Sequence, residues 1–236
     1  MGPGRLLPRA WKETAKSSKK GVDRPVGYRH NGFVMPPKTA DMPEAASASS
    51  PARDEIVSVA ADLFYQQGYH ATGIQQIINE AGIAKGTFYS HFKSKEELGV
   101  AWLQRRHTQW NGWVEKSLAS KSTPRAKLLG IFEFIEQWMS DTEFRGCAFL
   151  NTASEIPSGD NPMRAEVESH KSDLREKVRG LVREHWASES GAGVSRKADI
   201  IFVLIDGAIV QAQTFRDPWP IRAARKETKE LLSSSP

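Results

Sequence analysis

Apolar residues recur at helical spacing from residue 51 to the C-terminus, without the alternation of apolar and polar residues that marks a strand. Ser50 suits an N-cap, Pro51 suits the first helical position, and Gly68 suits the end of this first helix. Proline and glycine clusters separate the later segments. The expected helices cover residues 51–67, 73–81, 85–91, 95–119, 124–141, 162–189, 195–215 and 219–233. The sequence therefore predicts an all-α fold.

The net charge of +5 comes entirely from the first 50 residues. Residues 1–50 contain nine Lys or Arg and four Asp or Glu, whereas residues 51–236 contain 24 of each kind. The leader is also rich in Gly, Pro and Ser, so we expect a disordered segment over residues 1–50. It is either an unstructured leader, with Met35 or Met42 as alternative starts, or a basic arm that touches DNA phosphates. Net charge therefore gives no argument for nucleic-acid binding by the rest of the chain.

Cysteine usage and hydropathy bear on where this chain works. Cys147 is the single cysteine, which excludes an internal disulfide framework and fits a reducing setting. The basic N-terminus lacks an apolar stretch of signal-peptide length. The longest strongly apolar run, residues 200–205, is stopped by Asp206 and is too short to span a bilayer. We therefore predict a cytoplasmic protein with no membrane partner.

The segment 72–98 has the pattern of two short helices joined by a tight turn. Thr72 is placed to cap the first of them. The buried face of that helix is expected to consist of Ile74, Ile77, Ile78 and Ala81. Gly82 and Ile83 follow, at the position where a helix-turn-helix needs a tight turn and then an apolar plug.

The second helix of the segment begins near Lys85 and carries Phe88 and Phe92 inward, because residues four apart share a face. Residues 81–95 contain three lysines and no acidic residue, and such a local cationic patch suits DNA phosphates. Gly86 allows close backbone approach. The exposed or partly exposed positions are Lys85, Gly86, Thr87, Tyr89, Ser90 and His91. This is the geometry of a helix that enters the major groove.

The segment from Ala60 to Leu98 resembles the N-terminal DNA-binding domain of the TetR family of bacterial repressors. In that family an ALELF…GY…T…I…AGV run is followed by KGTFYxHFxSKEEL, and the chain matches this pattern almost residue for residue. Position 84 is Ala where the family commonly has a small polar residue, so a cap or contact is lost there. The resemblance implies that the DNA backbone or adjacent bases are contacted by Lys85, Thr87, Tyr89, His91 and Lys95. Gln75, Gln76 and Thr72 are further candidates for DNA contact, as is the backbone at Gly86.

The rest of the chain resembles the family in layout, with a helix-turn-helix domain at 51–96 and a ligand-binding and dimerisation domain at 97–236. Aromatic residues are dense in the helices at 95–119 and 124–141, which suits a cavity for an apolar or aromatic ligand. Ordinary core packing is the alternative for each residue taken singly. The predicted ligand-binding residues are Trp102, Trp110, Trp113, Phe132, Trp138 and Cys147.

Cys147 allows two interpretations. It lies in the stretch 144–156, which resembles a segment of one branch of the family where a helix near the pocket follows a Gly-Cys pair. A free cysteine is usually a small buried hydrophobe. Arg145 beside it would instead favour a thiolate, and Cys147 would then sense oxidants or electrophiles.

Residues 195–215 and 219–233 are expected to be the dimerisation helices. The first of them is apolar on more than one face, and its small central residues permit close helix approach. The predicted dimer contacts are Leu204, Gly207, Ala208, Gln211 and Leu231. Two copies of this helix pair would form a four-helix bundle across a two-fold axis, which implies a palindromic operator.

These features predict a ligand-responsive transcriptional repressor that binds a palindromic double-stranded DNA operator as a homodimer. A small apolar or aromatic effector in the C-terminal domain would release it, and a thiol-based repressor that senses through Cys147 is the alternative. An enzyme is disfavoured, because the histidines form no metal-spaced pair and the sequence has neither a phosphate loop nor a nucleophile elbow. No cofactor or metal is predicted. A helical adaptor that has lost DNA binding is a third possibility, against which the intact segment 85–95 argues.

Overall fold

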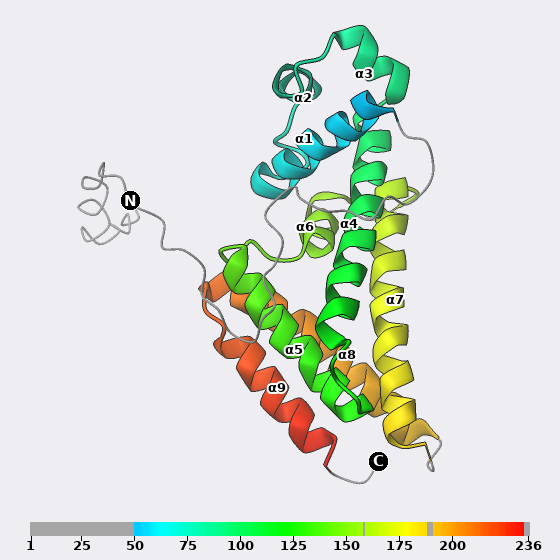
Figure 1. Ribbon diagram of the computed structural model, residues 1–236, viewed down its shortest axis with the longest axis vertical. Coiled ribbons are helices and arrows are strands. Elements are labelled where there is room, and N and C mark those ends of the chain that lie inside the picture. The colour runs from blue at the N-terminus through cyan, green and yellow to red at the C-terminus, as the bar shows by residue number, and fades with distance from the viewer. Residues whose placement is uncertain (1–49, 158, 188–190, 234–236) are drawn as a thin grey trace, which may run out of the picture. The chain divides into compact units, whose positions relative to one another are not determined.

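The computed structural model describes residues 50–157, 159–187 and 191–233, and every regular element within these ranges is an α-helix (Figure 1). The helices are α1 (Pro51–Gln67), α2 (Ile74–Glu80), α3 (Lys85–His91), α4 (Lys95–Leu118), α5 (Pro124–Asp141), α6 (Ala148–Glu155), α7 (Pro162–His185), α8 (Ala192–Phe215) and α9 (Trp219–Leu231). The all-α prediction is confirmed for the described residues. The predicted disorder of residues 1–50 lies outside them, except at Ser50.

Short polar residues followed by proline start three of the longer helices. Ser50 accepts a hydrogen bond from the backbone N–H three residues on (3.3 Å), and Pro51 is the first residue of α1. Thr123 and Asn161 likewise accept backbone N–H bonds at the starts of α5 and α7, and a proline follows each. The first N–H groups of a helix have no partner inside it, so these local caps fix where each helix begins.

The start of α2 differs from the prediction. Its N-cap residue is Gly73, which provides no side-chain hydrogen bond. Thr72 is fully buried, and its hydroxyl donates to the Gly68 carbonyl (2.8 Å) just past the end of α1. Carbonyls at a helix end lack partners inside the helix, so the hydroxyl satisfies the end of α1 and not the start of α2. The predicted capping role of Thr72 is wrong, and its burial also removes the predicted phosphate contact.

Residues 148–155 form α6, which helical spacing alone did not predict. The helix has only 8 residues, between Cys147 and Ile156, and too few apolar positions repeat over that length to reveal it. The resemblance of segment 144–156 to a family segment with a helix after its Gly-Cys pair did predict it.

The connection between α7 and α8 also differs from the expected bounds. α7 ends at His185 instead of residue 189, because Trp186 adopts non-helical backbone angles (φ −111°, ψ 51°). α8 begins at Ala192 instead of residue 195. The residue before it, Gly191, has a φ of 132°, a conformation that favours glycine.

Helix α1 packs against α4 and also against α2 and α3, and α4 continues alongside α5 and α7 (Figure 1). α8 contacts α5, α7 and α9. Buried side chains from both ends of α4, from Leu98 to Leu118, belong to a single hydrophobic cluster. Because α4 runs unbroken across the predicted boundary at residue 96, the division into domains 51–96 and 97–236 stays a prediction.

Among the described residues, one helix, α8, is long and apolar enough to cross a membrane, judged by its length and composition alone. This is weak evidence for a membrane span, since a core helix of a water-soluble protein meets the same criterion. The packing of α8 against three other helices accounts for part of its apolar composition.

One side of α8 remains exposed. The side chains of Ile200, Val203 and Val210 are 39%, 65% and 42% exposed. Together with Gly207 and Gln211, which are also exposed, they form what we call the α8 face. Two of the predicted dimer contacts thus lie on this face, while Leu204 and Leu231 are half-buried.

The prediction that Ala208 contributes a dimer contact needs correction. Only 5% of Ala208 is exposed, and it packs in the hydrophobic core of its own chain. One residue along a helix is a rotation of about 100°, which carries Ala208 away from the exposed Gly207 and toward the neighbouring helices.

Candidate nucleic-acid interface and the core behind it

α3 is anchored by two buried phenylalanines and exposes its other side. Phe88 and Phe92 are 0% and 1% exposed, with ring centres 6.2 Å apart, which confirms their predicted inward orientation. Tyr89 is 44% exposed, and its ring packs edge-on against Phe88 at 5.2 Å. Tyr89 is therefore held on one side by Phe88 and remains partly open to solvent, with the Lys85 ammonium 6.0 Å from its ring centre.

The exposed side of α3 and the turn after it carry positive charge without acidic partners. Lys85 and Lys93 are exposed and form no ion pair with the described residues. Nothing lies within 4 Å of the position a Gly86 side chain would occupy, so a backbone phosphate can approach the helix there. Thr87 is half-buried on the same helix. The predicted set Lys85, Gly86, Thr87 and Tyr89 thus shares one open surface.

Gln75 and Gln76 lie on α2 and bond to neighbouring polar side chains. The Gln75 amide donates to Asn79 (2.9 Å), and the Gln76 amide donates to Glu80 (2.9 Å) and to Gln67 (3.3 Å). Gln75 is exposed and Gln76 is half-buried. Gln75 is thus the more accessible of the two.

His91 and Lys95 lie at the edge of this surface and contact other parts of the chain. The Lys95 ammonium is 4.3 Å from the centre of the Tyr69 ring and 3.5 Å from the His70 carbonyl oxygen. Partial burial lowers the Lys95 pKa. His91 Nε2 is 3.3 Å from the Ser50 hydroxyl at the start of α1. Both side chains therefore connect α3 and α4 to the α1 region.

The predicted ligand-binding aromatics pack against other aromatic rings of the core. Trp102 lies against Phe64 of α1, with ring centres 5.2 Å apart. Trp110 packs edge-on against Phe134 (5.8 Å), and Trp138 stacks with the same ring at 6.4 Å. Phe132 and Cys147 are also buried, whereas Trp113 is half-buried.

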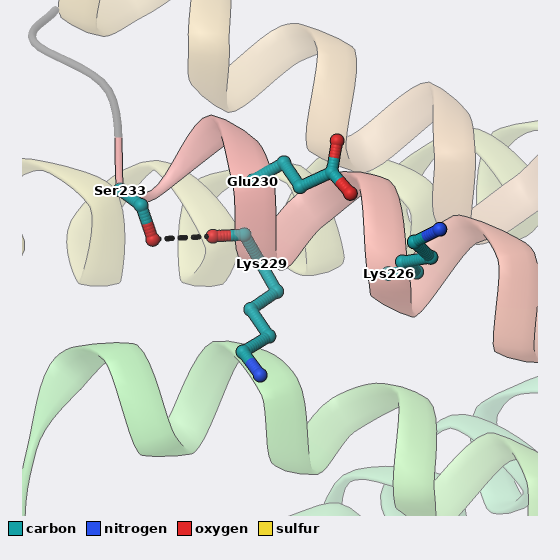
Figure 2. Close-up of a pocket in the computed structure, with 4 residues that line it drawn as sticks. All are labelled: Lys226, Lys229, Glu230 and Ser233. Carbon is teal, nitrogen blue, oxygen red and sulfur yellow. Dashed lines mark hydrogen bonds between the residues drawn. The ribbon is translucent and has the colours of Figure 1, made fainter.

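Two surface hollows in the described part of the chain lie away from these aromatics. One is beside the end of α9 and is lined by Lys226, Lys229, Glu230 and Ser233. Figure 2 shows Lys229 extending from α9 toward a neighbouring helix while Glu230 points the other way. The other hollow lies between α7 and α8 and is lined by Arg179, Arg183, Val194, Ser195 and Ala198. None of the predicted ligand-binding residues lines either hollow.

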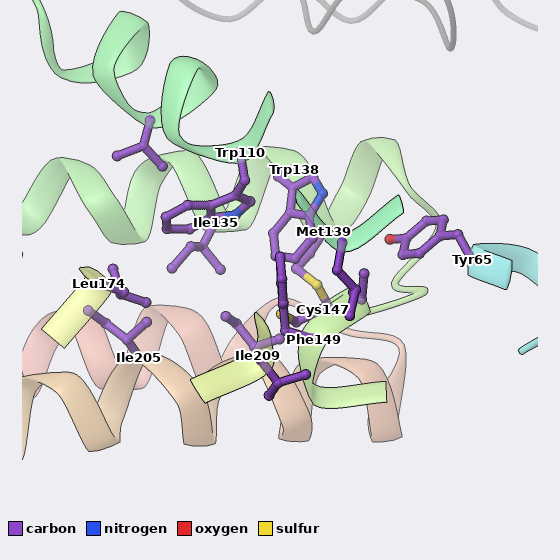
Figure 3. Close-up of a cluster of buried hydrophobic side chains, with 14 of the residues drawn as sticks. Tyr65, Trp110, Ile135, Trp138, Met139, Cys147, Phe149, Leu174, Ile205 and Ile209 are labelled. Atoms are coloured by element: carbon purple, nitrogen blue, oxygen red, sulfur yellow. The ribbon is translucent and has the colours of Figure 1, made fainter. Parts of the chain in front are cut away.

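Figure 3 shows part of the buried hydrophobic cluster, with Trp110, Trp138 and Phe149 among its side chains. Polar groups that the sequence did not reveal are buried beside it. His170 is 2% exposed, and the Phe149 ring stacks on it at 3.6 Å. His107 Nδ1 is 3.0 Å from His170 Nδ1. The indole N–H of Trp138 and the hydroxyl of Thr152 are buried without a hydrogen-bond partner. A histidine within the apolar stripe of α7 was the available signal for His170.

α6 is fastened to α1 and the turn after it at both of its ends. At one end, the Tyr65 hydroxyl donates to the Gly146 carbonyl (2.8 Å). At the other, the Glu155 carboxylate accepts the backbone N–H groups of Tyr69 (3.1 Å) and His70 (2.7 Å). His70 Nε2 is also 2.9 Å from the Glu155 carbonyl oxygen. The segment that carries Phe149 is therefore bonded directly to α1 and to the turn that leads into the helix-turn-helix.

Two family profiles match this chain. The profile described as "Bacterial regulatory proteins, tetR family" matches residues 56–101, and "Tetracyclin repressor-like, C-terminal domain" matches residues 124–228. The chain belongs to the TetR family of transcriptional regulators. The first match covers α1–α3 and the start of α4, and the second covers α5 through most of α9 of this TetR-family regulator.

Its relatives include regulators with opposite named effects. The HTH-type transcriptional repressor NemR of Escherichia coli (strain K12) is 22% identical over 188 residues, 77% of this chain and 94% of NemR. The HTH-type transcriptional activator FasR of Mycolicibacterium smegmatis is 30% identical over 124 residues, 51% of each chain. The crystal structure of SCO4454, a TetR-family regulator from Streptomyces coelicolor, superposes with a TM-score of 0.70 and 25% identity, covering 77% of this chain and 94% of SCO4454.

The position of Cys147 in this TetR-family regulator does not favour the redox alternative. Its side chain is 4% exposed at the residue before α6. Reactive thiols generally lie in partly exposed surroundings, whereas buried cysteines behave as small apolar residues.

Among the described residues, no group of three or more His, Cys, Asp or Glu is arranged to hold a metal ion.

The buried His170 predicts an acid-sensitive core. Burial, then the nearby charges of Lys171 and His107, lower the His170 pKa to about 3. An unfolded chain binds a proton at this histidine near pH 6.5 while the folded one does not, so stability is lost as pH falls below 6.5. Between pH 7 and pH 5 the free energy of unfolding should fall by roughly 2 kcal/mol from this group alone.

Urea unfolding at the two pH values, with the wild type and His170→Gln, tests this prediction. The drop between pH 7 and pH 5 should be smaller in the variant by about 2 kcal/mol. Asp and Glu side chains titrate mainly below pH 5, so they contribute little to the difference between the wild type and the variant. An equal drop in both proteins would contradict the prediction.

Proposed function

We propose that this TetR-family regulator is a ligand-responsive repressor that binds a palindromic operator as a dimer and leaves it when a small molecule binds the C-terminal domain. The observation that carries the proposal is the open cationic surface of α3, held in place by Phe88 and Phe92. A short helix supported from behind, with a hydroxyl, a lysine and a glycine in front, suits insertion into the major groove.

The proposed DNA contacts follow the exposed side of α3. Lys85 would pair with a phosphate, and Gly86 would let the backbone approach the duplex. Tyr89 and Thr87 would donate hydroxyl hydrogen bonds to phosphates or base edges. Gln75 adds a candidate from α2, whereas His91 and Lys95 are placed to position α3 and α4.

The proposed effector site is the buried cluster of α4–α7 that contains Trp110, Trp138 and His170. An apolar or aromatic molecule suits a site walled by these rings, and the unpartnered indole N–H of Trp138 provides a donor for it. The stacked Phe149 and His170 fill the space between these helices, so binding would require them to repack. Because Phe149 belongs to α6, that repacking would act on the bonds between α6 and α1. Allosteric coupling of this kind typically amounts to about 1–3 kcal/mol.

The proposed dimer forms through the α8 face and α9. TetR-family regulators typically act as dimers, and an exposed apolar stripe along a long helix suits a two-fold contact. A two-fold dimer would place two α3 helices on half-sites about 34–36 Å apart, or a multiple of that distance.

DNA binding by the purified chain tests this proposal, with DNA flanking its own gene compared with random DNA across a salt series. Tyr89→Ala should weaken specific binding by about 1–3 kcal/mol, and Lys85→Ala should reduce the salt slope by about 1. Lys116→Ala, at an exposed lysine near the C-terminal end of α4, is the matched control and should leave both quantities unchanged. Affinity equal to that for random DNA and unchanged in both α3 variants would contradict the proposal.

A further inference from the structure

Arg106 on α4 is a half-buried cation with no acidic partner. Among the described residues, its guanidinium forms neither an ion pair within 4 Å nor a hydrogen bond. Desolvation lowers the Arg106 pKa, against the smaller opposing effects of Tyr65, Cys147 and Asp62. Lys171 and Arg164, half-buried in the same region, do have partners: Lys171 pairs with Asp206 at 2.7 Å, and Arg164 bonds a backbone carbonyl. A partly desolvated guanidinium without a hydrogen bond inside the chain keeps its N–H groups available to an anionic partner from outside.

The contacts of the Arg106 guanidinium are with aromatic rings, whereas a half-buried arginine usually pairs with a carboxylate. Its guanidinium carbon lies 4.4 Å from the centre of the Tyr65 ring and 5.7 Å from that of Trp113. Arg145, in the loop before α6, approaches the same Tyr65 ring to 5.8 Å. It too forms no ion pair with the described residues. Two guanidinium groups from different elements thus converge on one ring.

The loop that carries Arg145 is held in a defined conformation. Glu143 and Phe144 have φ values of 51° and 57°, and Gly146 has a φ of 85°. The Asn151 amide donates to the Arg145 carbonyl (3.2 Å), and the Tyr65 hydroxyl donates to the Gly146 carbonyl. These bonds keep the backbone of Arg145 beside Tyr65, so its side chain starts from a fixed point close to that ring.

The unsatisfied groups in this neighbourhood are donors. Besides the two guanidinium groups, the Trp138 indole N–H is buried without an acceptor. Thr142 connects Trp138 to the loop that carries Arg145, since its hydroxyl donates to the Trp138 carbonyl (2.9 Å) and its carbonyl accepts the backbone N–H of Arg145 (3.0 Å). In Figure 3 the Tyr65 hydroxyl points toward the part of the cluster that holds Trp138 and Cys147. What the neighbourhood lacks is an acceptor, and beside two cations the matching acceptor is an anion.

We propose that the effector is an organic carboxylate whose charged group pairs with Arg106 and Arg145, at the junction of α1, α4 and the loop before α6. Tyr65, Trp113 and Trp138 would contact its aromatic or apolar body. This inference rests on the proposed ligand response, because it names the chemical class of that ligand. A carboxylate at this junction touches the helix-turn-helix and the C-terminal helices at once.

Paired probes test the charge requirement on the full-length chain. Benzoate and cinnamate are each compared with the uncharged amide, benzamide or cinnamamide, by the concentration dependence of Tm. The carboxylates should raise Tm and the amides should not. Arg106→Gln and Arg145→Gln should weaken the apparent Kd by about tenfold or more, because the charge-assisted hydrogen bonds are lost. Arg105→Gln, which removes the same charge one residue earlier on α4, should retain the effect.

The Tm of each variant without a probe shows whether it is folded. Equal shifts by acid and amide, no shift by either, or a carboxylate shift that persists in both Arg106→Gln and Arg145→Gln would overturn the proposal. DNA affinity measured with the same probes separates it from the proposed function. If amides release DNA as well as acids do, ligand response stands and the carboxylate site falls. If acids bind through Arg106 without changing DNA affinity, the site stands and the proposed response falls.

Discussion

Val203→Glu is expected to convert the proposed dimer to a monomer and to lower the affinity for a palindromic operator by well over tenfold. Val203 is the most exposed of the three apolar side chains of the α8 face, at 65%, with Ile200 and Val210 one and two turns away on the same side. In a two-fold contact the new carboxylates of both copies would be buried near the axis. An unpaired buried charge costs several kcal/mol, and the cost falls on both copies at once.

Light scattering after gel filtration gives the mass of the variant, and the operator titration gives its affinity. The matched control is Ala165→Glu, which adds the same charge at an exposed position of α7 and should remain dimeric. A folded Val203→Glu protein that is still a dimer would show that the α8 face is not the interface. Loss of the dimer with unchanged operator affinity would separate dimerisation from DNA binding.

Helix starts were predictable because their signals are local. Ser50, Thr123 and Asn161 act on N–H groups two or three residues away, and the prolines after them reinforce the same boundary. Thr72 was assigned the wrong role for the converse reason. A threonine before an apolar run looks the same whether its hydroxyl bonds forward to α2 or, as here, back to the Gly68 carbonyl.

The exposed side of α3 was predictable from helical spacing. Once Phe88 and Phe92 are placed inside, the positions between them must lie on the other faces of the helix. The orientation of Lys95 was not, because its neighbours Tyr69 and His70 lie about 25 residues earlier in the chain. The core shows the same limit. Aromatic density does not distinguish a cavity wall from a packed core, and only the helix pairing placed Trp102 against α1 instead of near Trp138.

Glu155→Ala is expected to destabilise the fold by about 2–3 kcal/mol and to weaken the connection between α6 and the helix-turn-helix. Glu155 accepts the N–H groups of both Tyr69 and His70, and hydrogen bonds to a charged group are worth about 1.5–3 kcal/mol. Gly68, with a φ of 101°, lets the carboxylate approach this turn, since Glu155 lies 3.0 Å from where a side chain would begin.

Urea unfolding of Glu155→Ala, compared with Glu168→Ala, measures this contribution. Glu168 is an exposed glutamate that pairs with Arg164 one turn away on α7, and such surface pairs contribute under about 1 kcal/mol. Equal losses of stability in the two variants would show that the Glu155 hydrogen bonds contribute no more than a surface ion pair.

The functional consequence follows from where those bonds lie. Any ligand that repacks Phe149 against His170 moves α6, and Glu155 joins the end of that helix to the turn between α1 and α2. Glu155→Gln keeps one carbonyl oxygen as an acceptor, so the variant should fold and bind operator while ligand releases it several-fold less effectively. Operator titrations with and without an effector measure this coupling directly. If Glu155→Gln released DNA as fully as the wild type, the signal would have to pass through α4 instead of α6.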